Sequence, residues 1–105
     1  MTPKLCRVER ETAAVVIFSS HDDAGGGSIV GVMRKGDMAV IVGGVVLSST
    51  MRMSYVRVIS PHFGPGWVIE STANTDLVEI KCRTLKVVTI VVNVYDWVYL
   101  VRRRQ

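Results

Sequence analysis

The chain reads Lys35-Gly-Asp-Met-Ala-Val-Ile-Val42, a tight-turn sequence followed by a strand whose two faces are both apolar. Two further short runs follow, at Tyr55–Ile59 and Leu77–Ile80, and the turn sequence Gly64-Pro-Gly-Trp67 lies between them. Short strands separated by turn residues are typical of small closed β-barrels. We therefore expect the central part of the chain to form such a barrel.

The residue composition favours strands over helices. The sequence contains 20 Val and 7 Ile but only 5 Ala and 5 Leu. β-Branched side chains lose rotamer freedom in a helix but pack well on a pleated sheet. A chain of 105 residues has the length of one domain. We expect a single all-β domain over residues 1–105, with its core at about 13–81.

The glycines and the polar stretches predict how the strands are connected. Ser19–Ser28 contains three consecutive glycines and predicts a hairpin loop, and Gly43-Gly44 predicts a break or bulge in the strand that contains it. Three other segments are expected outside the regular strands of the core: an arm or short edge strand at 1–9, a turn at 60–66 and a polar connection at 70–76.

The segment 86–101 is apolar but does not fit a membrane helix. Such a helix needs about 20 apolar residues, whereas this segment is shorter and contains Asn93 and Asp96. Its many β-branched residues disfavour a helix of any kind. Two alternatives remain, which are a hairpin with strands at 86–92 and 97–101 or a single long bent strand. Neither alternative implies a membrane partner.

The sequence contains no recognisable catalytic or metal-binding motif. Cys6 and Cys82 are isolated and lack the paired spacing of a zinc site, and no nucleophile lies in a motif with a base. His21-Asp22-Asp23 are adjacent on a glycine-rich loop, which predicts a solvated hairpin tip rather than an ion site. We therefore expect a non-enzymatic protein without a cofactor or a small-molecule substrate.

The N-terminal ten residues are charged and lack the apolar core of a secretory signal peptide. The two cysteines are too few for a disulfide scaffold, so free thiols are expected. Together these features predict an intracellular location or a place in a virion that is assembled inside a cell.

Several segments, taken in order, carry a family resemblance. They are Val15–Phe18, His21-Asp22-Asp23, Arg34–Asp37, Tyr55–Val58, Gly64–Val68 and Leu77–Ile80. This pattern resembles the strands and turns of SH3-like barrels, in particular bacterial SH3 modules and the small SH3-like proteins of phages. The resemblance covers about 65 residues and implies a small SH3-like barrel with extra terminal strands.

The resemblance does not extend to the polyproline-binding signalling subfamily, which uses a groove of clustered aromatic residues. At the corresponding positions the first loop has Ser19-Ser20, the central strand has only Tyr55, and the last turn has Ser71–Asn74. Recognition of proline-rich ligands is therefore not expected.

Two groups of aromatic residues are candidates for a protein interface. Tyr95, Trp97 and Tyr99 alternate along one predicted strand and would share a face, which favours self-association or docking if the barrel is already closed. The alternative is an extra strand folded across the mouth of the barrel. His62, Phe63 and Trp67 form the second group, and the alternative there is a structural Trp that closes one end of the barrel.

The first functional hypothesis is a structural or adaptor protein that assembles with itself or with a larger complex, such as a phage virion. The second is a small nucleic-acid-binding barrel, because the chain carries a net charge of +4. Its contacts with phosphate would come from seven basic residues: Arg34, Lys35, Arg52, Arg57, Arg102, Arg103 and Arg104.

Overall fold

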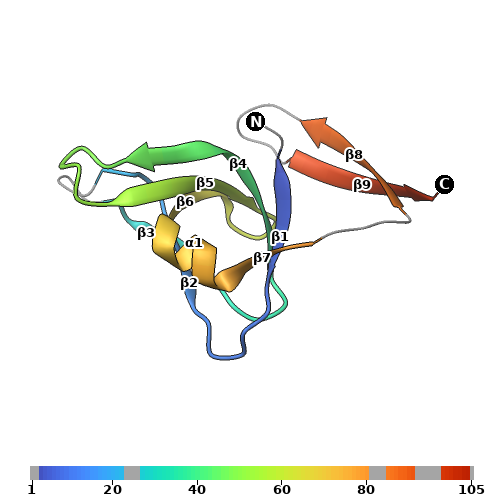
Figure 1. Cartoon of the computed structure of the whole chain (residues 1–105), viewed down its shortest axis with the longest axis horizontal. Helices are drawn as coiled ribbons and strands as arrows, with labels where there is room; N and C mark the ends of the chain where they lie inside the picture. The colour runs from blue at the N-terminus through green and yellow to red at the C-terminus, as the bar shows by residue number, and fades with distance from the viewer. Residues whose placement is uncertain (1–2, 23–26, 81–84, 92–97, 105) are drawn as a thin grey trace.

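The main body of the protein is a seven-stranded antiparallel sheet that curls into a half-barrel around one short helix (Figure 1). The computed structural model describes residues 3–22, 27–80, 85–91 and 98–104, and for the last two segments it describes the backbone. The architecture confirms the all-β fold class that the β-branched composition predicts.

The strands of the half-barrel do not follow the chain order within the sheet. They are β1 (Lys4–Val8), β2 (Val15–Phe18), β3 (Ile29–Met33), β4 (Met38–Leu47), β5 (Ser54–Ser60), β6 (Gly64–Ile69) and β7 (Leu77–Glu79). The spatial order is β3-β2-β6-β5-β4-β1-β7, so β3 and β7 are the two edges. The N-terminal strand β1 therefore has two neighbours, β4 and β7, and is not an edge strand or an arm.

The turn before β4 has the geometry that Lys35-Gly36-Asp37 predicts. The amide of Asp37 donates to the carbonyl of Arg34 at 2.9 Å, and the Asp37 carboxylate accepts from the Arg34 amide at 2.8 Å. Gly36 has a φ of 93°, which is a conformation that other residues rarely adopt. The local hydrogen bonds of Asp37 and the freedom of Gly36 together fix where β4 begins.

β4 contains the bulge that Gly43-Gly44 predicts. Val42 pairs with Arg57 and Val45 pairs with Val56, so the two glycines have no counterpart on β5. Gly43 has a φ of 76°, and the strand continues beyond the bulge to Leu47. The bulge lets one long strand curve around the half-barrel. Because it inserts two residues, the side chain of Val45 stays on the core side of the sheet.

β6 begins earlier than the sequence predicts, because the turn before it is shorter. The hydroxyl of Ser60 accepts from the amides of His62 and Phe63 at 3.3 and 3.2 Å, which closes the turn within three residues. Gly64 and Gly66 then belong to the strand and not to a longer turn. Gly66 is required there because a Cβ would overlap the Ile17 side chain.

The polar connection 70–76 forms helix α1 (Glu70–Asp76), which was not predicted. Its Ser, Thr and Asn residues are weak helix formers, so intrinsic propensity does not explain it. The helix lies on the concave side of the sheet (Figure 1), where Ala73 is 3% exposed. Burial of one small residue against the sheet therefore stabilises this short helix.

The hydrophobic core lies between the concave face of the sheet and α1. Its buried members come from every strand of the half-barrel, from α1 and from the loop before β2: Cys6, Val8, Ala13, Val15, Ile17, Met33, Ala39, Val56, Val58, Val68, Ala73 and Leu77. Cys6 and Val8 lie in it, so the core begins near residue 6.

The C-terminal segment forms two strands that pair with each other. β8 (Leu85–Val91) and β9 (Val98–Arg104) are antiparallel, with Leu85 opposite Arg104 and Val91 opposite Val98. This pairing corresponds to the hairpin alternative and not to one long strand. Residues 92–97, which connect the two strands, lie outside the described residues.

Candidate partner-binding surface

Trp67 lies on the convex face of the sheet, away from the core. Its neighbour Val68 is completely buried in the core, and successive side chains of a strand point to opposite faces. Trp67 pairs with Arg57 on β5 and with Phe18 on β2, so both of these side chains flank it on the same face.

Five residues form a continuous group around this indole, and we call them the Trp67 cluster: Phe18, His21, Tyr55, Arg57 and Trp67. The imidazole of His21 is tilted by 47° against the indole, with the ring centroids 4.5 Å apart. The guanidinium carbon of Arg57 is 5.1 Å from the centroid of the same indole, within the range of a cation–π contact. Phe18 and Tyr55 meet edge to face at 6.3 Å.

The loop after β2 is folded back so that His21 reaches Trp67. The Ser20 hydroxyl accepts from the Asp22 amide at 3.0 Å, and the Ser49 hydroxyl donates to the Asp22 carboxylate. Because Ser49 belongs to the loop between β4 and β5, this bond ties the two loops together beside the cluster. The prediction of a freely solvated tip is therefore wrong for His21, which is half-buried on Trp67.

The other aromatic residues of the predicted interface group have different positions. The ring of Phe63 packs against the core and lies over Gly31, where a Cβ would overlap it. His62 is exposed in the turn, with its ring 6.2 Å from that of Phe63. Phe63 thus faces the core side of the sheet, whereas Trp67 faces outward.

Of the C-terminal aromatic group, the structure describes only Tyr99. Tyr95 and Trp97 lie outside the described residues. Tyr99 lies in β9, where its backbone is opposite Ile90.

The basic residues predicted to contact nucleic acid do not form one continuous wall among the side chains of 3–22 and 27–80. Arg34 and Lys35 lie in the turn before β4, and Arg52 lies in the loop after it. The strand that separates them, β4, has ten residues and spans roughly 30 Å when extended. Lys35 is also 3.6 Å from the carboxylate of Glu11. Arg57 belongs instead to the Trp67 cluster.

The three terminal arginines are part of a strand. Arg102, Arg103 and Arg104 in β9 are opposite Val87, Lys86 and Leu85 in β8. A prediction from sequence alone treats them as a tail, because a charged end gives no signal for strand pairing.

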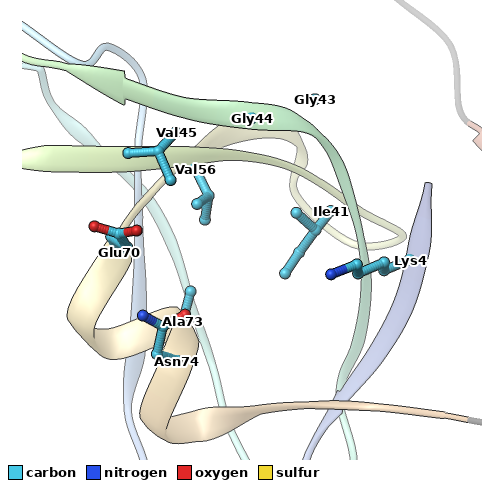
Figure 2. Close-up of a pocket in the computed structure, with 9 residues that line it drawn as sticks. All are labelled: Lys4, Ile41, Gly43, Gly44, Val45, Val56, Glu70, Ala73 and Asn74. Carbon is cyan, nitrogen blue, oxygen red and sulfur yellow. The ribbon is translucent and has the colours of Figure 1, made fainter. Parts of the chain in front are cut away.

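A depression opens on the concave side, between β4 and α1 (Figure 2). Its volume is about 220 Å³, and nine residues line it: Lys4, Ile41, Gly43, Gly44, Val45, Val56, Glu70, Ala73 and Asn74. Gly43-Gly44, which predicts a bulge, is the one signal in the sequence that marks the position of this depression.

The described part of the chain holds no group of three or more His, Cys, Asp or Glu side chains that could bind a metal ion. Cys6 is 2% exposed, and burial, together with the negative charge of Glu79, raises the pKa of its thiol. A buried thiol with a raised pKa is a poor nucleophile. The Trp67 cluster places half-buried aromatic groups and a half-buried guanidinium side by side, with Tyr55 buried among them.

In the segments that the structure covers, no helix has the length and apolarity needed to cross a membrane. Comparison with protein-family models, with curated proteins and with solved structures finds no match to this chain.

Proposed function

We propose that the chain is a non-enzymatic adaptor, built on an SH3-like barrel, that docks a protein partner on the Trp67 cluster. The observation that carries the proposal is the joint position of His21 and Arg57 on the outward indole of Trp67. Trp, Tyr and Arg are the residues that contribute most to protein–protein binding energy. Trp67 and Arg57 lie together here, half-buried, on one face of the sheet, and Tyr55 is buried beside them.

The cluster has a preorganised geometry, which lowers the entropic cost of binding. Arg57 and Trp67 stand on paired strands, and His21 is held by a loop that Ser49 anchors through Asp22. Fixing such side chains on binding would otherwise cost about 0.5–1.5 kcal/mol each. The cluster suits a segment with apolar or aromatic side chains next to an acidic residue, because the half-buried indole still offers some apolar surface and Arg57 a positive charge.

The larger assembly in which such an adaptor works is proposed to be a phage or virion complex, as the resemblance to small phage SH3-like proteins implies. A nucleic-acid role for the same cluster is the alternative. The separation of Arg34 and Lys35 from Arg52 gives that alternative less support, because a backbone-tracking groove needs contiguous positive charge.

The test begins with peptides selected from a random library on the immobilised full-length chain. We expect the best peptide to lose about tenfold or more in affinity for Trp67→Ala, measured by calorimetry. Arg57→Ala should weaken binding less and is the second variant, in case Trp67→Ala is unstable. Val78→Ala, at an exposed residue of β7, is the matched control and should bind as the wild type does.

Two results would reject this proposal. One is a selected peptide that binds Trp67→Ala and Arg57→Ala with unchanged affinity. The other is tight binding of a single-stranded oligonucleotide that weakens steeply with salt and depends on Arg57, which would assign the cluster to nucleic acid.

A further inference from the structure

The concave face of the sheet is not fully covered, and the uncovered part is apolar. Val45 and Leu47, beyond the bulge of β4, are 51% and 50% exposed. Val45 is paired with Val56, a core residue, so the side chain of Val45 is on the core side. Leu47, two residues further along the same strand, is on that side too. Helix α1 contacts β2, β5, β6 and β7. Beyond the bulge, the core-facing side of β4 is thus left partly open beside the helix.

The depression between β4 and α1 adjoins this open strip, because Val45 lines it. Its floor is apolar, from Ile41, Val45, Val56 and Ala73 (Figure 2). At about 220 Å³ it is smaller than the roughly 300–1,000 Å³ of pockets that enclose a whole small molecule. It is suited instead to one side chain of a larger partner.

The rim of the depression offers backbone groups. Gly43 and Gly44 have no partner on β5, and a Cβ built on Gly43 would meet nothing within 4 Å. A bulge leaves its extra residues unpaired in the ladder, and glycine in a strand marks places where another backbone can approach closely. An extended peptide can satisfy such groups by main-chain hydrogen bonds.

The depression has a positive and a negative end. The Lys4 side chain approaches from β1, and the Glu70 carboxylate lies at the other side, at the start of α1 (Figure 2). Within residues 3–22 and 27–80, neither of the two side chains is in an ion pair with another described residue. A complementary segment therefore carries an acidic residue toward Lys4 and a basic residue toward Glu70.

We propose that this depression is a second binding site, which takes an extended peptide segment of the pattern acidic–apolar–basic. The apolar side chain enters between Val45 and Ala73, and the peptide backbone bonds to Gly43 and Gly44. The site is on the opposite face of the sheet from the Trp67 cluster, so it is independent of what that cluster binds.

The probe is the terminally blocked tripeptide Glu-Leu-Lys, titrated to about 20 mM against the ¹⁵N-labelled full chain, because a single tripeptide is expected to bind only in the millimolar range. We expect amide shifts concentrated at Gly43, Gly44 and Val45. Val45→Lys places a charge in the depression at a residue that is already half-exposed, and it should weaken binding by about tenfold or more. Val78→Lys places the same charge at an exposed valine of β7 that does not line the depression, so it is the matched control and should leave the affinity unchanged.

A charge exchange adds a specificity test. Lys4→Glu should bind Glu-Leu-Lys about two- to five-fold more weakly and Lys-Leu-Lys more tightly by a similar factor, as for partly exposed ion pairs. The proposal is overturned if Gly43–Val45 do not shift, if Val45→Lys binds as the wild type does, or if Val78→Lys weakens binding as much as Val45→Lys does. Shifts at Gly43–Val45 that grow with protein concentration alone would assign the depression to a second copy and reject the peptide.

Discussion

The guanidinium carbon of Arg57 lies 5.1 Å from the centroid of the Trp67 indole, and the two residues face each other across the β5–β6 pair. Cross-strand neighbours of this kind influence both the stability of the sheet and the chemistry of its surface. The pair lies on the convex face and is not part of the core cluster, so its contribution to stability can be measured separately from that of the core.

We expect a double-mutant cycle of Arg57→Met and Trp67→Phe to give a coupling of about 0.5–1 kcal/mol in the free energy of unfolding, because the cation–π contact is partly exposed. Urea unfolding of the four proteins measures it. Arg52→Met, in the loop after β4, replaces Arg57→Met in the control cycle and should show no coupling with Trp67.

The second prediction concerns Phe63 and Gly31. A Cβ at residue 31 would overlap the Phe63 ring, so Gly31→Ala should destabilise the protein by about 1–3 kcal/mol. In the background of Phe63→Ala the same change should cost less than about 1 kcal/mol, because the overlapping ring is gone. Thermal or urea unfolding gives the two differences, and equal costs in both backgrounds would show that the ring does not define the space above Gly31.

The third prediction compares two ion pairs. The Arg10 guanidinium donates to the Asp76 carboxylate at 2.9 and 3.0 Å, and the Asp76 side chain is only 8% exposed. Arg10→Ala leaves that carboxylate without this partner and should cost about 1–2 kcal/mol, a value reduced because Arg10 itself is exposed. Arg7→Ala breaks the exposed pair with Glu9 and should cost less than about 0.5 kcal/mol. Similar losses of stability in the two variants would show that burial of the Asp76 carboxylate does not make its ion pair with Arg10 more important than the exposed pair.

The fourth prediction follows from the raised pKa of the Cys6 thiol, which burial causes first and the charge of Glu79 second. Between the ordinary thiol pKa of 9.0 and the higher value in the folded chain, the folded state binds more protons than the unfolded state. Stability therefore falls as the pH rises above about 9, by at most about 1.4 kcal/mol per pH unit from this group.

Cys6→Ala should remove that part of the decline. The measurement is the free energy of unfolding between pH 7 and pH 10 for both proteins, in a Cys82→Ser background so that only one thiol titrates. Parallel curves for the two proteins would show that the Cys6 thiol does not ionise differently on folding.

The sequence predicts the strands well where side-chain alternation and turn chemistry agree. The turn at Gly36 and the bulge at Gly43-Gly44 depend on local rules, and the structure confirms them. Helix α1 was missed because its residues have low helix propensity and it is stabilised by tertiary contacts, namely the burial of Ala73 against the sheet and the ion pair of Asp76 with Arg10.

The candidate site could be predicted only in part, for a related reason. The sequence predicts Trp67 as an interface residue and, separately, Arg57 as a phosphate contact. Their contact depends on the β5–β6 register, and the position of His21 depends on a bond between two loops 27 residues apart in sequence. Such long-range relationships leave no local pattern in a single sequence.

The most direct measurement is an NMR chemical-shift map of the full chain with the best library-selected peptide. If the Trp67 cluster is the docking site, the largest changes will occur at the Trp67 indole N–H and at the amides of His21 and Arg57. Changes that leave these three residues unaffected while binding is saturated would contradict it.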